Sequence, residues 1–149
     1  MLAEFQCNSL LHVDPCGDPV ATVAHIPAAF TLEAGGGSVW VAAGTRVVRY
    51  DERSHRVQSF ATGNTVETLS IGSARIWVLT INRRGQNTLL RLNPITGRIQ
   101  ARRRLAGSRT DVHDSDGYVW LGGLDASRTP TLWTIEPDTL KERRVASLA

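Results

Sequence analysis

The chain has 149 residues, of which 42% are hydrophobic and 21% are charged. This composition is typical of one globular domain and excludes a disordered chain, a collagen-like chain and a disulfide scaffold. No apolar run reaches the roughly 18 residues that a membrane helix needs, so we expect no membrane partner. The net charge of +3 is spread along the chain, and it is weak support for a nucleic-acid partner.

The N-terminal residues carry no secretion signal and no clear pairing for the two cysteines. Residues 1–6 lack the basic and apolar segments of a signal peptide, which predicts a cytoplasmic location unless the chain is part of a longer one. A disulfide between Cys7 and Cys16, a metal site with His12 and two free thiols are all conceivable. A strand over residues 9–14 would hold the two Cα atoms about 30 Å apart, whereas a disulfide tolerates about 7 Å, so free thiols are favoured.

Two short motifs recur along the chain. An apolar run ending in an acidic or amide residue occurs four times, as LLHVD at 10–14, VVRYD at 47–51, LLRLN at 89–93 and LWTIE at 132–136. A second motif is centred on tryptophan, and Trp40, Trp77 and Trp120 follow one another at intervals of 37 and 43 residues. A repeat of about 40 residues with four short strands is the signature of a β-propeller blade.

The repeats predict an all-β fold, a β-propeller of four-stranded antiparallel blades. Residues 1–28 form a partial blade with its third and fourth strands and a worn second strand near the N-terminus. Complete blades occupy residues 30–61, 67–106 and 111–149. In each complete blade the tryptophan lies on the second strand and the alternating run forms the third. The predicted first strands are Phe30–Ala34, Glu67–Ile71 and Asp111–Asp114, and the fourth strands are Val20–Ile26, Arg56–Ala61, Arg98–Leu105 and Glu142–Leu148.

The blade count stops short of a ring. Propellers close with about four to eight blades, whereas this chain supplies about three and a half, an incomplete ring. We therefore expect either part of a larger propeller or one component of an oligomer, with open blade flanks available for self-association. Two copies would supply about seven blades, but the partial blade offers no first strand, so part of a larger propeller is favoured over a dimer.

The repeat resembles those of the streptogramin (virginiamycin B) lyase family and of the YVTN and NHL-like propeller families. The residues that carry the resemblance are GSVWV at 37–41 and LRLNPITGRI at 90–99. The lyase family uses a histidine and a glutamate with Mg²⁺ in the central channel. The resemblance therefore implies a propeller fold and makes His113 and Glu33 candidates for catalysis, because His113 is the only histidine on a predicted first strand.

The first strands of a propeller line its central channel, which makes their polar residues candidate binding groups. Glu33, Ser70 and His113 occupy equivalent positions in the three blades. Thr31, Thr68 and Asp111 lie two residues earlier, on the same face of each strand. Such a channel would hold an acid, a base and oxygen atoms that bind metals. A water-filled tunnel lined by polar residues explains the same pattern.

Carboxylates cluster around His113 at the start of the last blade. Asp114 and Asp116, together with Asp111, could bind Ca²⁺ or Mg²⁺ through oxygen. The alternative is a polar hairpin turn at Asp116-Gly117. The run Arg102–Arg104 lies on an outermost strand, where charge also prevents edge-to-edge aggregation, so it does not by itself indicate nucleic-acid binding.

The sequence favours a binding or scaffold module over an enzyme. We expect it to recognise a protein or small ligand at its loop face or central channel. The alternative is a metal-assisted lyase or hydrolase that uses His113 with a channel carboxylate and Mg²⁺ or Ca²⁺.

Overall fold

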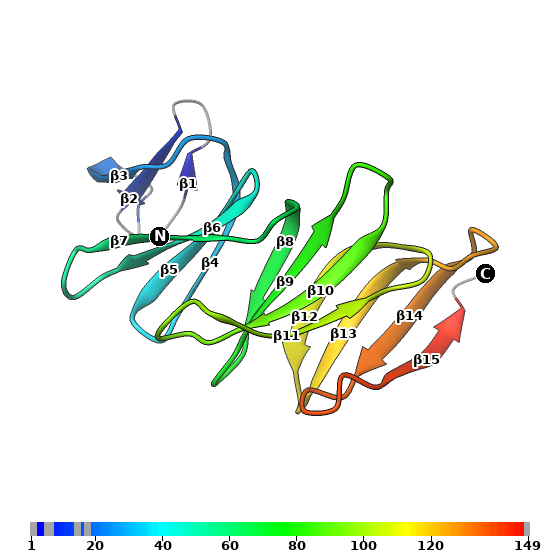
Figure 1. Ribbon diagram of the computed structural model, residues 1–149. Coiled ribbons are helices and arrows are strands. Elements are labelled where there is room, and N and C mark those ends of the chain that lie inside the picture. The colour runs from blue at the N-terminus through cyan, green and yellow to red at the C-terminus, as the bar shows by residue number, and fades with distance from the viewer. Residues whose placement is uncertain (1–2, 5–7, 14–15, 17–18, 148–149) are drawn as a thin grey trace. The chain divides into compact units, whose positions relative to one another are not determined.

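The structure, a computed structural model, describes residues 3–4, 8–13, 16 and 19–147 (Figure 1). These residues form antiparallel strands joined by turns, with no helix among them. Accordingly, no described segment is a helix that is long and apolar enough to cross a membrane. The chain divides into two compact units, residues 1–63 and residues 64–149, and each is described by itself.

The first unit contains a three-stranded sheet and a four-stranded sheet. Both are simple meanders in which each strand pairs with the next along the chain. The strands are β1 (Ala3–Glu4), β2 (Ser9–Val13), β3 (Pro19–His25), β4 (Ala29–Gly35), β5 (Ser38–Ala43), β6 (Arg46–Asp51) and β7 (Val57–Ala61).

The second unit contains two four-stranded meanders, and the first strand of the second meander packs against the first two strands of the other. The strands are β8 (Thr65–Ile71), β9 (Ile76–Ile81), β10 (Asn87–Leu92), β11 (Ile99–Arg104), β12 (Ser108–Ser115), β13 (Tyr118–Leu124), β14 (Pro130–Ile135) and β15 (Glu142–Ser147). We call β8–β11 the inner-unit blade and β12–β15 the last blade.

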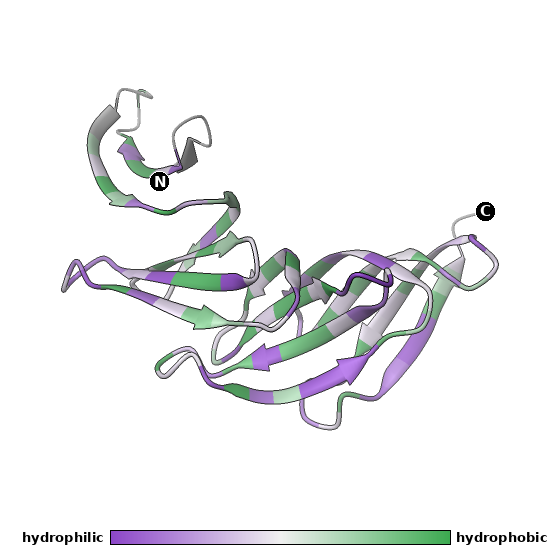
Figure 2. Cartoon of the chain, turned by 45° about the horizontal axis from the view of Figure 1, so that its top comes forward, coloured by the Kyte–Doolittle hydropathy of each residue, from purple (hydrophilic) through white to green (hydrophobic). Residues whose placement is uncertain are grey.

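The burial pattern explains why the second strands of two blades are almost wholly apolar. Strands β5 and β9 are buried along almost their whole length, because both of their faces pack against other residues. The fourth strands are far more exposed, and they alternate between exposed and half-buried positions in β11. Figure 2 shows hydrophobic residues along the strands and hydrophilic residues on the loops and on the outer strands of the second unit.

In the three four-stranded blades, the turns between third and fourth strands share one backbone hydrogen bond, from the fifth residue of the turn to the carbonyl oxygen of the first. The side-chain oxygen of Asn93 accepts hydrogen bonds from the backbone N–H groups of Ile95 and Thr96, both at 2.9 Å. Gly97 then closes the turn with a φ of 65°. In the last blade, Leu140 has a φ of 57° at the corresponding place, a conformation that costs a residue with a side chain more than it costs glycine.

Each unit has its own hydrophobic core. In the first unit, Leu10 and Ile26 of the three-stranded part pack with Val39, Val41 and Tyr50 of the next sheet. In the second unit, the core lies between the two blades. It consists of Trp77, Leu79, Leu89, Leu105, Val112, Val119, Leu121, Trp133 and Ile135.

The predicted fold class is confirmed, with three four-stranded blades and one partial blade among the described residues. The second strand expected near the N-terminus is present as β1, and its neighbours at 1–2 and 5–7 lie outside the described residues. Strand β12 begins at Ser108, three residues before the predicted start. A register shift between Arg109 and Asp111 lets the strand continue to pair with β13 beyond the predicted boundary.

Candidate functional site

The pairing of first and second strands places the predicted channel residues at matching positions. Glu33 pairs with Trp40, Ser70 with Trp77, and His113 with Trp120. The positions two residues earlier match in the same way: Thr31 pairs with Ala42, Thr68 with Leu79 and Asp111 with Gly122. The three blades therefore share one register, as the repeat alignment predicts.

The surroundings of these matching residues differ. Glu33, Thr31 and Thr68 are half-buried, whereas His113 and Asp111 are exposed. Ser70 is buried, and its hydroxyl oxygen accepts a hydrogen bond from the backbone N–H of Asp114 at 3.1 Å. Ser70 thus joins the two blades of the second unit. Glu33 lies in the first unit and His113 in the second, and their joint catalytic role stays a prediction.

Asp114, one of the predicted metal ligands, lies at the junction between the two blades. Its carboxylate accepts a hydrogen bond from the indole N–H of Trp77, with 2.8 Å between Nε1 and Oδ2. Gly72 makes this contact possible, because a Cβ at that position would lie 2.1 Å from Oδ2 of Asp114. The sequence did not indicate this pairing, since 37 residues separate its two members.

Asp116, the other predicted metal ligand, lies in the turn between β12 and β13. It has a φ of 54° and accepts a hydrogen bond from the Ser115 hydroxyl at 3.3 Å. Within the described residues, no group of three or more histidine, cysteine, aspartate or glutamate side chains comes together in a way that could hold a metal ion. Metal binding by Asp114 and Asp116 stays a prediction.

A polar cluster in the second unit is centred on a buried arginine that no local pattern in the sequence indicated. Arg109 is 2% exposed, and its guanidinium carbon lies 3.3 Å from the centre of the Trp133 ring. Its Nη2 atom lies 2.7 Å from Oε1 of Glu142, and its backbone N–H donates to the side chain of Asn87. Glu142 also pairs with Arg103 of the other blade, so the cluster ties both blades together.

A cavity of about 290 Å³ lies beside this cluster. Asp125 lines the cavity from the loop between β13 and β14. Its Oδ1 atom accepts hydrogen bonds from the backbone N–H groups of Thr129 and Ser127, at 3.0 and 2.9 Å. These hydrogen bonds, that of Thr129 first, hold the pKa of Asp125 below its ordinary value. The nearby Arg144 guanidinium acts in the same direction.

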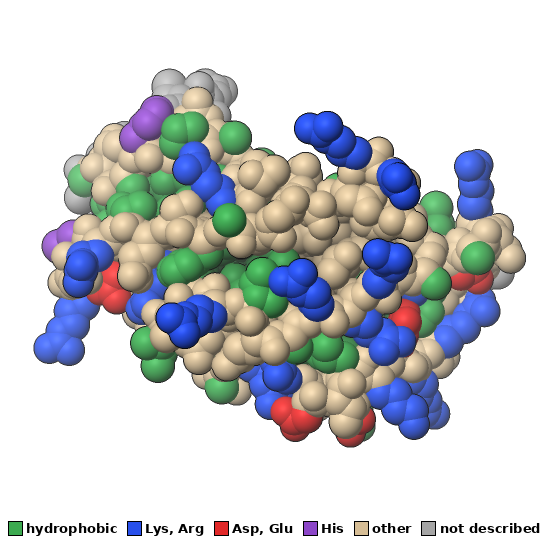
Figure 3. All heavy atoms as spheres, in the orientation of Figure 1, with side chains coloured by type: hydrophobic (Ala, Val, Ile, Leu, Met, Phe, Trp, Pro, Cys, Tyr) green, Lys and Arg blue, Asp and Glu red, His purple; other side chains and the backbone are tan. Residues whose placement is uncertain are grey.

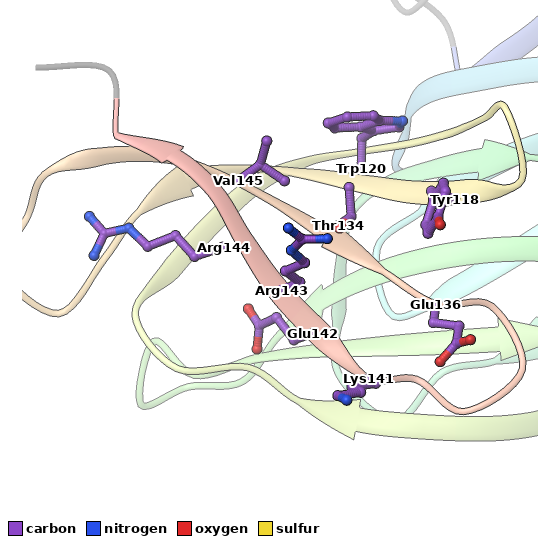
Figure 4. Close-up of a pocket in the computed structure, with 9 residues that line it drawn as sticks. All are labelled: Tyr118, Trp120, Thr134, Glu136, Lys141, Glu142, Arg143, Arg144 and Val145. Atoms are coloured by element: carbon purple, nitrogen blue, oxygen red, sulfur yellow. The ribbon is translucent and has the colours of Figure 1, made fainter.

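A second hollow, with a volume of about 720 Å³, lies on one face of the last blade (Figure 4). Trp120, Thr134 and Arg143 form a row across this face, because they pair in register on β13, β14 and β15. Tyr118 and Val145 are about half exposed beside that row. We call this surface the Trp120 face. Its lining consists of Tyr118, Trp120, Thr134, Glu136, Lys141, Glu142, Arg143, Arg144 and Val145.

In the view of Figure 3, basic side chains are spread over the surface among hydrophobic and other side chains. On the outer strand β11, Arg102 and Arg104 are exposed, whereas Arg103 is half-buried and pairs with Glu142. Three adjacent arginines in the sequence thus point to opposite faces of the strand, as alternation predicts.

Comparison with solved structures identifies the fold. The WD40 domain of Neurospora crassa Pan2 matches with a TM-score of 0.68 and 14% identity, over 95% of this chain and 47% of that chain. The chain has a β-propeller fold. The WD40 domain of Toxoplasma gondii coronin matches with a TM-score of 0.67 and 9% identity, over 87% of this chain and 37% of that one.

A third propeller comes from an enzyme. Dihydro-heme d1 dehydrogenase NirN, solved in complex with DHE, matches with a TM-score of 0.71 and 15% identity, over 96% of this chain and 34% of that chain. No family model and no curated protein matches the sequence. This chain spans less than half the length of each of the three similar structures. Because their identity to it is low, the likeness shows the fold alone.

Proposed function

We propose that this chain is a β-propeller binding or scaffold module that recognises a protein or small ligand at its loop face or central channel. It acts as part of a larger propeller or oligomer. The similar structures include two WD40 domains, and WD40 propellers are typically protein-interaction modules. We also propose that the repeats of this chain are of the kind found in the streptogramin lyase, YVTN and NHL-like propellers.

The observation that carries the proposal is the alternation along β12. Asp111 and His113 are exposed, whereas Val112 between them is 3% exposed and packs into the core of the second unit. A strand anchored by its buried side chain holds the two polar side chains in fixed positions. Binding groups on a rigid strand lose little freedom when a partner binds, which favours recognition at this place.

The loop between β13 and β14 offers a second fixed surface. Asp125 bonds two backbone N–H groups of this loop, and Arg144 of β15 pairs with Asp125 at 3.0 Å. Ser127 and Arg128 are exposed at its tip. A loop that is tied at its base and exposed at its tip is suited to contact a partner.

A peptide library displayed on phage tests the proposal. The full chain is immobilised, and the enriched peptides are measured against it in solution by calorimetry. We expect peptides that bind at micromolar affinity, and the double substitution of Asp111 and His113 by alanine weakens those that bind the β12 surface at least about tenfold. Arg128→Ala weakens in the same way the peptides that bind the loop between β13 and β14.

The matched control is His25→Ala, because His25 is also an exposed strand histidine but lies on β3 of the other unit. Its substitution leaves the affinities unchanged. A library that yields no binding peptide would contradict the proposed function. So would peptides whose affinity falls with His25→Ala but not with the β12 or loop substitutions.

A further inference from the structure

The Trp120 face carries Tyr118, the one exposed aromatic residue among the described residues of the second unit. Tyr118 is 50% exposed, Val145 is 49% exposed, and Trp120, which also lines the hollow, is half-buried. Charged side chains surround this apolar centre, with Glu136, Lys141 and Arg143 among them. An apolar centre inside a charged rim is the usual anatomy of a protein interface.

The inner-unit blade shows what covers this face when a neighbour is present. Trp77 corresponds to Trp120 and is fully buried, and it packs with Trp133 and Ile135 from the third strand of the last blade. Around it, Nη1 of Arg91 donates to the carbonyl oxygen of Pro137 at 2.6 Å, and Arg75 pairs with Asp138. At this junction, therefore, the tryptophan face of one blade is covered by the next blade, its third strand included.

The partial blade of the first unit carries the corresponding third strand. By the repeat alignment, Leu11 and Val13 of β2 correspond to Trp133 and Ile135 of β14. Leu10 is buried in the core of its own unit, so Leu11 and Val13 point to the opposite flank of the strand. Both are half-buried, and the pairing of β1 with β2 supplies this blade with a second strand.

We propose that the Trp120 face binds a second copy of this chain through the β2 flank that carries Leu11 and Val13. The two copies join head to tail, so that the Trp120 face of each one meets the β2 flank of the other. The proposal rests on the proposed function, in which the chain forms part of a larger propeller or oligomer, and it names the partner. The partial blade still lacks a first strand, but β1 gives it three paired strands. This chain aligns with 47% of the Pan2 propeller, so we infer that two copies together make up one such ring.

Light scattering and sedimentation of the full chain across a concentration series test the proposal. We expect a species of twice the 16.3 kDa chain mass, in equilibrium with the monomer at low concentration. Trp120→Glu places a charge at the centre of the interface and raises the dimer dissociation constant about 30-fold or more. Val145→Glu also raises the dimer dissociation constant. It replaces Trp120→Glu as the test if circular dichroism shows that Trp120→Glu is unfolded.

Ile95→Glu is the matched control. Ile95 is 76% exposed in the turn after β10, outside the Trp120 face, and its substitution adds the same charge without changing the dimer. A monomeric wild-type chain at every concentration overturns the proposal. A dimer that both face variants form as tightly as the wild type also overturns it.

Mixing two variants tests the head-to-tail arrangement. Leu11→Glu, like Trp120→Glu, damages both junctions of its own dimer. A mixture of the two retains one intact junction, between the Trp120 face of the Leu11 variant and the β2 flank of the Trp120 variant. We expect dimers in the mixture at concentrations where each variant alone is monomeric. If the two Trp120 faces contact each other instead, the mixture yields no mixed dimer, and this result overturns the head-to-tail arrangement.

Peptide binding and oligomeric state, both measured on the wild-type chain, distinguish failure of the dimer proposal from failure of the proposed function. A wild-type monomer that binds library peptides overturns the dimer and leaves the binding module standing. Leu11→Glu is screened as well, because it leaves the Trp120 face and β12 intact, whereas a dimer through the Trp120 face would cover His113, which pairs with Trp120. A Leu11→Glu monomer that binds no peptide overturns the binding module, and a wild-type dimer still supports the dimer proposal.

Discussion

The inner-unit blade and the last blade have the same strand order, the same register and a tryptophan at the same place, yet their tryptophan faces differ. Trp77 is fully buried, and its indole N–H is bonded to Asp114 of the next blade. Trp120 lies on an open face beside two half-exposed hydrophobic residues. Residues at equivalent positions of a repeat therefore contribute differently to the free energy of unfolding, because a blade completes its core only when a neighbour covers it.

The largest expected difference between the two blades is the cost of removing each tryptophan. Trp77→Ala empties a fully packed site and lowers the free energy of unfolding by about 4 kcal/mol. Trp120→Ala lowers it by about 2 kcal/mol or less at concentrations where the chain is monomeric, because water already reaches that side chain. Denaturation by guanidinium chloride, followed by circular dichroism, measures both. Equal costs would contradict the assignment of one closed and one open face.

The next test removes the buried cation that ties the two blades. Arg109→Met leaves Glu142 near the interface without its closest partner and costs about 3 kcal/mol. Arg144→Met is the control, since Arg144 forms a solvent-exposed pair with Asp125 and its loss lowers the free energy of unfolding far less. Unfolding in urea distinguishes the two. If Arg109→Met unfolds like the control, the cluster does not hold the blades together.

The hydrogen bond between Trp77 and Asp114 has a smaller expected effect. Asp114→Ala leaves the indole N–H without this acceptor and costs about 1–2 kcal/mol. Gly72→Ala has a similar effect, because its Cβ collides with the Asp114 carboxylate. Asp111→Ala, an exposed carboxylate on the same strand, costs about 0.5 kcal/mol or less. A double-mutant cycle with Trp77→Phe measures the coupling, and a coupling near zero would show that the bond contributes nothing.

The smallest effect concerns the loops at which the two blades turn from second to third strand. Asn82 and Asp125 make the same hydrogen bonds to backbone N–H groups, but only Asp125 titrates. The lowered pKa of Asp125 means that its contribution to stability is present above the unfolded pKa of about 3.9, and that it is lost as the pH falls through the folded value.

Asp125→Asn gives the last blade the loop chemistry of the inner-unit blade. We expect the variant to lose part of the decrease in melting temperature that the wild type shows below about pH 4. Thermal melts at a series of acidic pH values provide the measurement. An unchanged pH profile would show that the Asp125 carboxylate has the same pKa in the folded and unfolded chains.

Much of the fold could be predicted because its signals are local. Alternating apolar residues, the turn residues of Asn93–Gly97 and the repeated tryptophans each depend on a few neighbouring positions. The candidate site was predicted less completely. Asp111 and His113 are exposed as a binding surface requires, but Ser70 is buried between blades and Asp114 bonds an indole. These outcomes depend on contacts across 37 residues or more, which no local pattern contains.

The sequence by itself determined the blade, its strand order and its register, because the period of two along each strand and the period near 40 along the chain are both visible in it. The tertiary structure decided which surfaces are used. Whether a tryptophan is core or surface depends on the presence of the next blade. Arg109 looks like any other of the chain's many arginines until folding brings Trp133, Glu142 and Asn87 around it. Burial and charge pairing are properties of neighbours in space, and only the folded chain supplies those neighbours.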